Sequence, residues 1–177
     1  MSKALAPFLK TWLFSLVVLL LISCSNQKDT KQITRFQKIS SDSSGLTFTN
    51  KLTLDPTFNI YTYRNFYNGG GVGLGDINND GLIDIYLTAN QGPNKLYLNN
   101  GNFHFIDITE TAGVAGTKAW ATGVSMADVN GDGREDLYIG GAAGKEGKLM
   151  LQNAAGIFTE KKLAAFASDK NQEDMGA

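Results

Sequence analysis

The stretch DINNDGLID, residues 76–84, decides the fold of this chain, and DVNGDGRED at residues 128–136 repeats it. In each stretch oxygen-bearing side chains stand at places one, three, five and nine, and glycine stands at place six, where a tight loop turns sharply. These side chains are Asp76, Asn78, Asp80 and Asp84 in the first loop and Asp128, Asn130, Asp132 and Asp136 in the second. Place seven, Leu82 or Arg134, can offer only a backbone carbonyl. Hard oxygen ligands around a glycine turn are typical of calcium sites, so we predict a calcium ion in each loop.

The flanks of both loops predict strands, in contrast to the helices of a helix–loop–helix calcium hand. That hand needs a bidentate glutamate at place twelve, where this chain has Leu87 and Ile139. The flanking segments are rich in glycine and in β-branched or aromatic residues, which favour strands. The alternative is a pair of acidic turns that hold no metal, since Asp, Asn and Gly favour turns in any case.

Residues 1–23 are predicted to be a secretory signal peptide. Lys3 and Lys10 precede an apolar run of about twelve residues, which is shorter than the roughly twenty that span a bilayer. The run ends in Leu-Ile-Ser-Cys24, which resembles the lipobox of bacterial lipoproteins, and the resemblance implies cleavage before Cys24 and its acylation. Cys24 is the only cysteine, so an internal disulfide is excluded. The alternative is a free thiol in a short membrane helix.

Loss of the signal peptide removes two lysines and no acidic residue, which leaves 154 residues with a net charge of −3. This balance argues against a nucleic-acid partner, which favours a basic face. Polar residues 24–34 are predicted to be a tether between lipid and domain. Asn26 resembles the residue at this place in lipoproteins sent to the outer membrane, and Gln-Lys-Asp at 27–29 resembles surface-exposure signals. We therefore expect a cell-envelope protein, held at the outer membrane and exposed at the surface.

Strands and turns alternate from Phe36 onward with a period of 52 residues, the spacing of Asp76 and Asp128. Each loop has one strand before it and three after it, so that two units occupy about 69–110 and 120–162. A period of about fifty residues with four strands is typical of propeller blades, which stack to bury their faces. We predict an all-β fold, a partial β-propeller over residues 35–177.

The sequence at each end of the repeat region supports a further prediction about the propeller. Residues 36–48 are similar to 105–116 in the spacing of Phe and Ile, and are predicted to supply a strand that closes the ring. Gly176 lies 53 residues past Gly123, the glycine that leads into the second loop. A third blade should therefore begin at Gly176, and the chain is expected to be a fragment cut inside that blade.

The last strand of the first unit is predicted over residues 102–109, with Phe103, Phe105 and Ile106 as candidates for burial. His104, the only histidine, is interpreted as an exposed strand residue.

Two other stretches have competing interpretations. The glycine-rich residues 69–76 lack the glycine spacing and the following helix of a dinucleotide-binding loop. Residues 61–68, YTYRNFYN, place four aromatic side chains around Arg64. They could bind a sugar ring or a partner's side chains, or form a core strand that enters the first blade.

The repeats resemble the FG-GAP/VCBS repeats of calcium-binding propellers. The run from Phe58 to Gly141 is similar to bacterial relatives of the cartilage acidic protein family, which often carry an ASPIC/UnbV domain further on. Nearly all of residues 36–177 share this resemblance, although these residues include neither further blades nor an ASPIC/UnbV segment. The resemblance implies that the loop residues given above bind calcium.

Two function classes remain open. The first is a non-catalytic, calcium-rigidified module that binds a glycan or a protein at the cell surface. The alternative is the scaffold part of a larger secreted carbohydrate-active enzyme whose catalytic residues are missing here. The chain has one histidine and no thiol besides Cys24. The usual pairs of a catalytic nucleophile and a base therefore cannot be formed. The short inter-strand loops also favour the first class, so no catalytic residue is predicted.

Overall fold

The computed structural model describes residues 35–116 and 120–162. Cys24, the signal peptide, the tether and the expected start of a third blade lie outside these residues. All the strands belong to one compact unit that begins at Ile39. Among the described residues, no helix has the length and apolar character needed to cross a membrane.

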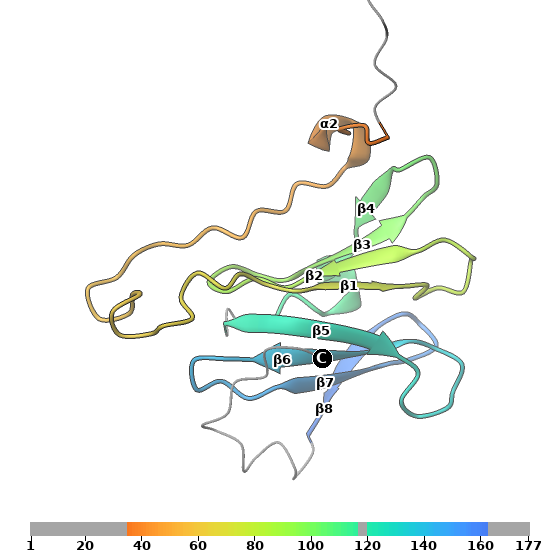
Figure 1. The fold of residues 1–177 in the computed structure, drawn as a ribbon. Coiled ribbons are helices and arrows are strands. Elements are labelled where there is room, and N and C mark those ends of the chain that lie inside the picture. Colours follow the sequence, from red (N-terminus) through yellow and green to blue (C-terminus); the bar gives the residue numbers. More distant parts are fainter. Residues whose placement is uncertain (1–34, 117–119, 163–177) are drawn as a thin grey trace, which may run out of the picture. The chain divides into compact units, whose positions relative to one another are not determined.

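The described strands form two antiparallel sheets with four strands each, joined in simple chain order (Figure 1). The first sheet contains β1 (Val72–Gly75), β2 (Asp84–Leu87), β3 (Lys95–Asn99) and β4 (Phe105–Asp107). The second contains β5 (Ala121–Ala127), β6 (Asp136–Gly141), β7 (Lys148–Gln152) and β8 (Phe158–Lys161). Two single-turn helices, α2 (Ser41–Ser44) and α3 (Thr109–Ala112), complete the described elements. The predicted all-β class is thereby confirmed, with two sheets of the kind expected for propeller blades.

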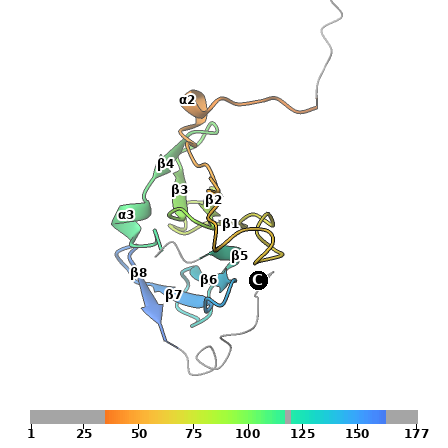
Figure 2. The same cartoon turned by 90° about the vertical axis from the view of Figure 1, so that its left-hand side faces the viewer.

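The two sheets lie against each other (Figures 1 and 2). They pack through unlike faces. One face of the first sheet enters the shared core with Tyr86, Leu96 and Leu98. The second sheet meets it with the opposite face of the repeat, through Val124, Met126, Leu137, Ile139, Met150 and Phe158. The counterparts of Val124 and Met126 in the first sheet are Val72 and Leu74, and each of those is 61% exposed. The contact between the sheets is therefore made by opposite faces of the repeated unit, one face from the first sheet and the other from the second.

The glycines in β1 and just before it lie where β5 approaches closely. A Cβ added at Gly73 would come within 3.1 Å of the Met126 side chain, and one at Gly71 would come within 3.0 Å of the Gly123 Cα. Glycine inside a strand commonly marks such a close approach of backbone. The glycine-rich run at 69–76 is therefore explained by the packing of the two sheets, and no dinucleotide-binding loop is needed to account for it.

The closing strand expected in residues 36–48 is wrong for the described structure, because the segment forms α2 and no strand. The reason is local. The Ser43 amide donates to the Ser40 side chain, which caps the start of the helix, and Gly45 ends the helix with φ of 77°. The similarity to residues 105–116 does hold for the second half of the segment, since α3 also ends at a left-handed glycine, Gly113.

The last strand of the first sheet is shorter than predicted. Asn102 and Phe103 have φ of 51° and 57°, so the turn continues to His104 before β4 begins. Phe105 is buried as expected. Phe103 and Ile106 are 69% and 44% exposed, and the prediction of their burial is wrong. His104 is exposed, as interpreted, but in the turn instead of a strand.

Residues 61–68 form turns that contribute to an aromatic cluster, and the predicted core strand is absent there. Tyr63 and Phe66 pack with Phe58 around Trp120, whose ring centroid lies 4.7 Å from that of Phe58. Tyr61 and Tyr67 point outward instead, and are 97% and 61% exposed. The segment thus divides its aromatic side chains between a small core and the surface.

Candidate metal centres

The first acidic loop is closed by its own carboxylates. Asp76 accepts hydrogen bonds from the amides of Asp80, at 3.0 Å, and Gly81, at 2.7 Å. Asn79 and Gly81 take positive φ angles of 58° and 85°, which glycine and asparagine adopt most readily. The sequence Asn-Asp-Gly therefore bends the chain back over Asp76.

Places three and five of this loop also point inward. The Asn78 side chain accepts from the Asp80 amide at 3.2 Å and donates to Asp80 Oδ2 at 2.8 Å. Asp80 Oδ1 in turn accepts from the Leu82 amide at 2.8 Å. The oxygens of places one, three and five thus gather around one short stretch of backbone.

Asp84, at place nine, is fully buried and joins the loop to the sheet. Its carboxylate accepts from the amides of Ile77, at 2.9 Å, and Asn99 on β3, at 2.7 Å. Burial raises the pKa of Asp84; the two amide bonds oppose this rise, and the nearby charges of Asp80 and Asp76 add to it. These three carboxylates are therefore close enough to repel one another.

The second loop repeats this arrangement almost atom for atom. Asp128 accepts from the amides of Gly131, Asp132 and Gly133 at 2.7 to 3.1 Å. The Gly133 amide makes the largest contribution to lowering the pKa of Asp128. Asp136, also buried, accepts from the amide of Val129 at 3.2 Å and from that of Gln152 on β7 at 2.8 Å. The repeated loop sequence therefore adopts the same backbone conformation in both repeats.

The two loops differ in the residue at place seven. Arg134 Nη2 lies 2.6 Å from Asp132 Oδ2, so the second loop already has a cationic partner of its own. Its counterpart in the first loop is Leu82, which has no charge. A cation bound in the second loop would compete with Arg134 for the Asp132 carboxylate.

The donor chemistry of both loops fits a hard cation such as calcium. Carboxylate and amide oxygens are its preferred ligands, and the mutual repulsion at Asp84 is the kind that a divalent ion relieves. As they stand, the described residues contain no group of three or more His, Cys, Asp or Glu side chains placed to hold a metal ion. The loop carboxylates are held by backbone amides, and Leu82 and Arg134 contribute no side-chain oxygen.

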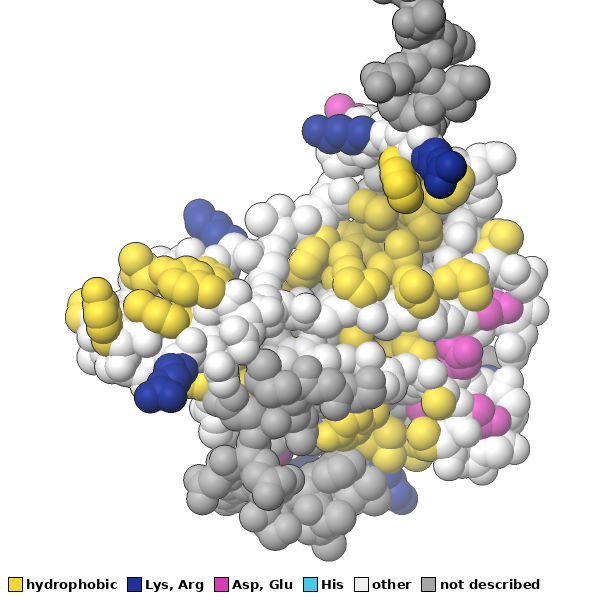
Figure 3. Space-filling view, viewed as in Figure 1, with side chains coloured by type: hydrophobic (Ala, Val, Ile, Leu, Met, Phe, Trp, Pro, Cys, Tyr) yellow, Lys and Arg dark blue, Asp and Glu magenta, His cyan; other side chains and the backbone are white. Residues whose placement is uncertain are grey.

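The two loops touch each other, which sequence reasoning did not foresee. The Asn79 side chain donates to the carbonyl of Gly133 at 3.0 Å, and the Gln152 side chain donates to that of Ile77 at 2.9 Å. Glu135, at place eight of the second loop, reaches the first loop beside Gly75. No spacing within one repeat reveals such contacts, because the partners belong to different repeats. Figure 3 shows Asp and Glu side chains gathered on the side of the molecule where the loops lie.

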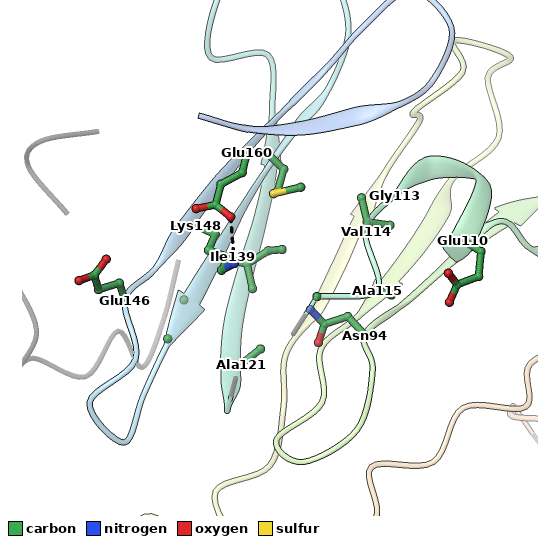
Figure 4. Close-up of a pocket in the computed structure, with 14 residues that line it drawn as sticks. Asn94, Glu110, Gly113, Val114, Ala115, Ala121, Ile139, Glu146, Lys148 and Glu160 are labelled. Atoms are coloured by element: carbon green, nitrogen blue, oxygen red, sulfur yellow. Dashed lines mark hydrogen bonds and ion pairs between the residues drawn. The ribbon is translucent and has the colours of Figure 1, made fainter. Parts of the chain in front are cut away.

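The described structure has a cleft beside the loops and a hollow away from them. A cleft of about 530 Å³ runs beside them and is lined by Asn78, Asn79, Arg134 and the turn between β7 and β8. A second hollow of about 310 Å³ lies between the α3 region and strands β6 to β8 (Figure 4). Its rim carries Glu110 and Glu146, and Lys148 pairs there with Glu160 at 2.9 Å.

The repeat is similar to known proteins. Residues 76–139 match the family described as FG-GAP-like repeat. The chain is 36% identical to cartilage acidic protein 1 of Xenopus tropicalis over 93 residues, which are 52% of this chain and 14% of that protein. It is 38% identical to cartilage acidic protein 1 of Mus musculus over 87 residues, which are 49% of this chain and 13% of that protein. The predicted resemblance is thus confirmed for the repeat region, and the chain spans about one seventh of the length of these curated relatives.

Proposed function

We propose that this chain, an FG-GAP-like repeat module homologous to part of cartilage acidic protein 1, binds calcium in its two loops and serves as a non-catalytic binding module. The observation that carries the proposal is the repetition of one loop geometry on equivalent oxygen donors. In each loop the side chains of places one, three and five converge, and a buried aspartate at place nine fixes the loop to its sheet. Calcium would neutralise the negative charge of these carboxylates.

Ligands of the first site would be the side chains of Asp76, Asn78, Asp80 and Asp84 and the backbone carbonyl of Leu82. In the second they would be Asp128, Asn130, Asp132 and Asp136 with the carbonyl of Arg134. An unfolded loop cannot gather these oxygens, so calcium stabilises the folded chain by linkage. The role of the cation is then structural: it sets the angle between the strands on either side of each loop.

The partner is a glycan or a protein at the cell surface. Tyr61 and Tyr67 are the exposed members of the aromatic segment, and the Tyr67 ring is held against Phe66 at a centroid distance of 5.1 Å. Arg64 is exposed on the same segment. Fixed aromatic faces beside a cationic side chain suit the apolar faces and hydroxyl groups of sugars as well as protein side chains.

Anchoring at the outer membrane would come from a lipid on Cys24. The proposal for this residue rests on the sequence alone, since Cys24 lies outside the described residues. Labelling with a fatty acid tests it: the wild-type chain should take up label, and Cys24→Ser should not. Label on the serine variant would overturn the anchor.

Calcium binding is tested by calorimetry on the full mature chain. We expect two sites with Kd of about 10⁻⁴ M or weaker, as in extracellular modules. A folded sample that gives no heat at millimolar calcium would overturn the calcium proposal.

Partner binding is tested separately on a glycan array, with and without a chelator. Tyr61→Ala and Tyr67→Ala should each lose the calcium-dependent signal. Phe103→Ala is the matched control, because Phe103 is also an exposed aromatic residue, 69% accessible, but lies in a different turn. Equal loss in all three variants would exclude the aromatic segment as the binding surface.

A further inference from the structure

Glu135 belongs to the second loop by sequence but to the first loop by position. A Cβ added to Gly75, the last residue before the first loop, would collide with Glu135 Oε2 and lie 2.8 Å from its Cδ. The Glu135 side chain therefore fills the space that a side chain at Gly75 would otherwise occupy. Glycine at this place leaves room for a carboxylate from the neighbouring repeat.

One oxygen of this carboxylate is left without a hydrogen bond. Among the described residues, Glu135 Oε2 is a buried oxygen with no hydrogen-bond partner. The Asp76 amide donates a hydrogen bond to the same carboxylate, and the charges of Asp76 and Asp84 lie near enough to repel it. A buried charge without a partner is unfavourable unless a counter-charge is present. A cation in the first loop would supply that counter-charge.

Two hydrogen bonds near Glu135 hold the second repeat against the first loop. Asn79 of the first loop donates to Gly133, two residues before Glu135, and Gln152 of β7 donates to Ile77. These bonds set the register between the repeats, so the approach of Glu135 does not depend on its own flexible side chain alone.

We propose that Glu135 supplies a carboxylate to the cation of the first loop, so that this site is composite and draws ligands from two successive repeats. The inference rests on the proposed calcium function. The first site then has four carboxylates, from Asp76, Asp80, Asp84 and Glu135, whereas the second has three and a competing arginine. Place eight of the first loop is Ile83, which is apolar and 51% exposed, so it cannot serve a further site in the same way. Because affinity follows the charge count of the ligands, the first loop binds calcium more tightly than the second.

The test isolates each site in the full mature chain. In a background of Asp132→Ala, which disables the second loop, calorimetry with calcium alone reports the first site. Glu135→Gln in that background should weaken calcium binding at least about ten-fold. Glu146→Gln is the matched control, because Glu146 is an exposed glutamate of the connection between β6 and β7, outside both loops, and it should leave the affinity unchanged.

Two further variants separate binding from folding. Gly75→Ala keeps every carboxylate but displaces Glu135, and should weaken the first site to a similar degree. In a background of Asp80→Ala, Glu135→Gln should leave the second site unchanged, which also shows that the substituted chain folds. If Glu135→Gln leaves the first site at full affinity, the composite site is overturned while the calcium proposal stands. If the wild-type chain binds no calcium, both are overturned.

Discussion

The first loop presents Asp80 to amide groups and Asn78, with a leucine at place seven, while the second loop pairs Asp132 with Arg134. The two backbones are otherwise alike, down to the buried aspartate that ties each loop to its third strand. The difference shows that the repeat pattern determines backbone shape, whereas the residues at places seven and eight determine the charge around the loop. Duplicate loops are therefore not duplicate sites, and the following substitutions test this distinction.

Removal of the buried aspartates should have the largest effect, and an equal one in both loops. Asp84→Ala and Asp136→Ala each leave two backbone amides without an acceptor. We expect each to lower the free energy of unfolding by about 2–4 kcal/mol, measured by urea titration without calcium. Asp84→Asn, which keeps one acceptor oxygen, should lose less. A large loss at one site alone would show that the two backbones are not equivalent.

Removal of the place-five carboxylates should affect calcium binding more than intrinsic stability. Asp80→Ala and Asp132→Ala should each abolish one calcium site and leave the other intact. The linked stabilisation lost per site is about 1–2 kcal/mol at ten times the Kd, read as a smaller rise of Tm on addition of calcium. A double variant that melts at the wild-type temperature in saturating calcium would contradict the structural role of the cation.

Exchange of the place-seven residues should sharpen the contrast between the loops. Arg134→Leu frees Asp132 from its ion pair and should tighten the second site about two- to five-fold, since a partly exposed ion pair is worth up to about 1 kcal/mol. Leu82→Arg should weaken the first site by a similar factor. Calorimetry on single-site backgrounds measures both. If Arg134→Leu weakens the second site, Arg134 does not compete with the cation.

The smallest effect is expected at a lysine–carboxylate ion pair, a kind of contact that occurs once in each sheet. Lys95 bonds Asp107 at 2.7 Å across β3 and β4, as Lys148 bonds Glu160 across β7 and β8. Lys95→Met should cost about 0.5 kcal/mol. Burial opposes the lowering of the Asp107 pKa, but the bonds from Lys95 and Thr109 outweigh it. A lowered acid pKa gives stability that is present above the unfolded pKa and lost as pH falls.

The effect of Lys95→Met should therefore shrink below about pH 4, the ordinary pKa of an aspartate. Urea titrations of both proteins at pH 7 and pH 3 measure this change. A constant difference between the two pH values would show that Asp107 keeps its charge without Lys95.

Features that depend on neighbouring residues in the chain were predicted well. The loops, most strands and the exposure of His104 follow from local patterns of oxygen donors, glycine and alternating apolar residues. The helical turn α2 also follows from local residues, since Ser40 and Gly45 are ordinary capping residues. The similarity of residues 36–48 to a later strand nevertheless favours a strand there, and that prediction is wrong. At Phe103, an apolar residue was assigned to burial although the Asn-rich turn extends through it.

Features that join the repeats could not be predicted from a single repeat. The insertion of Glu135 beside Gly75 pairs residues that lie far apart in the chain. The role of Trp120 is of the same kind, because its aromatic partners precede the first sheet. In both cases one side of the contact, a glycine or an isolated aromatic residue, carries no distinctive pattern of its own.

The packing of unlike faces has a consequence for how such genes change. Because the front of one sheet fits the back of the next, a tandem duplication of the coding segment supplies a new sheet whose face is already complementary to its predecessor. No compensating substitutions are required before the longer protein folds. Unequal crossing-over can therefore add or remove whole units of 52 residues, whereas loss of part of a unit leaves a sheet incomplete.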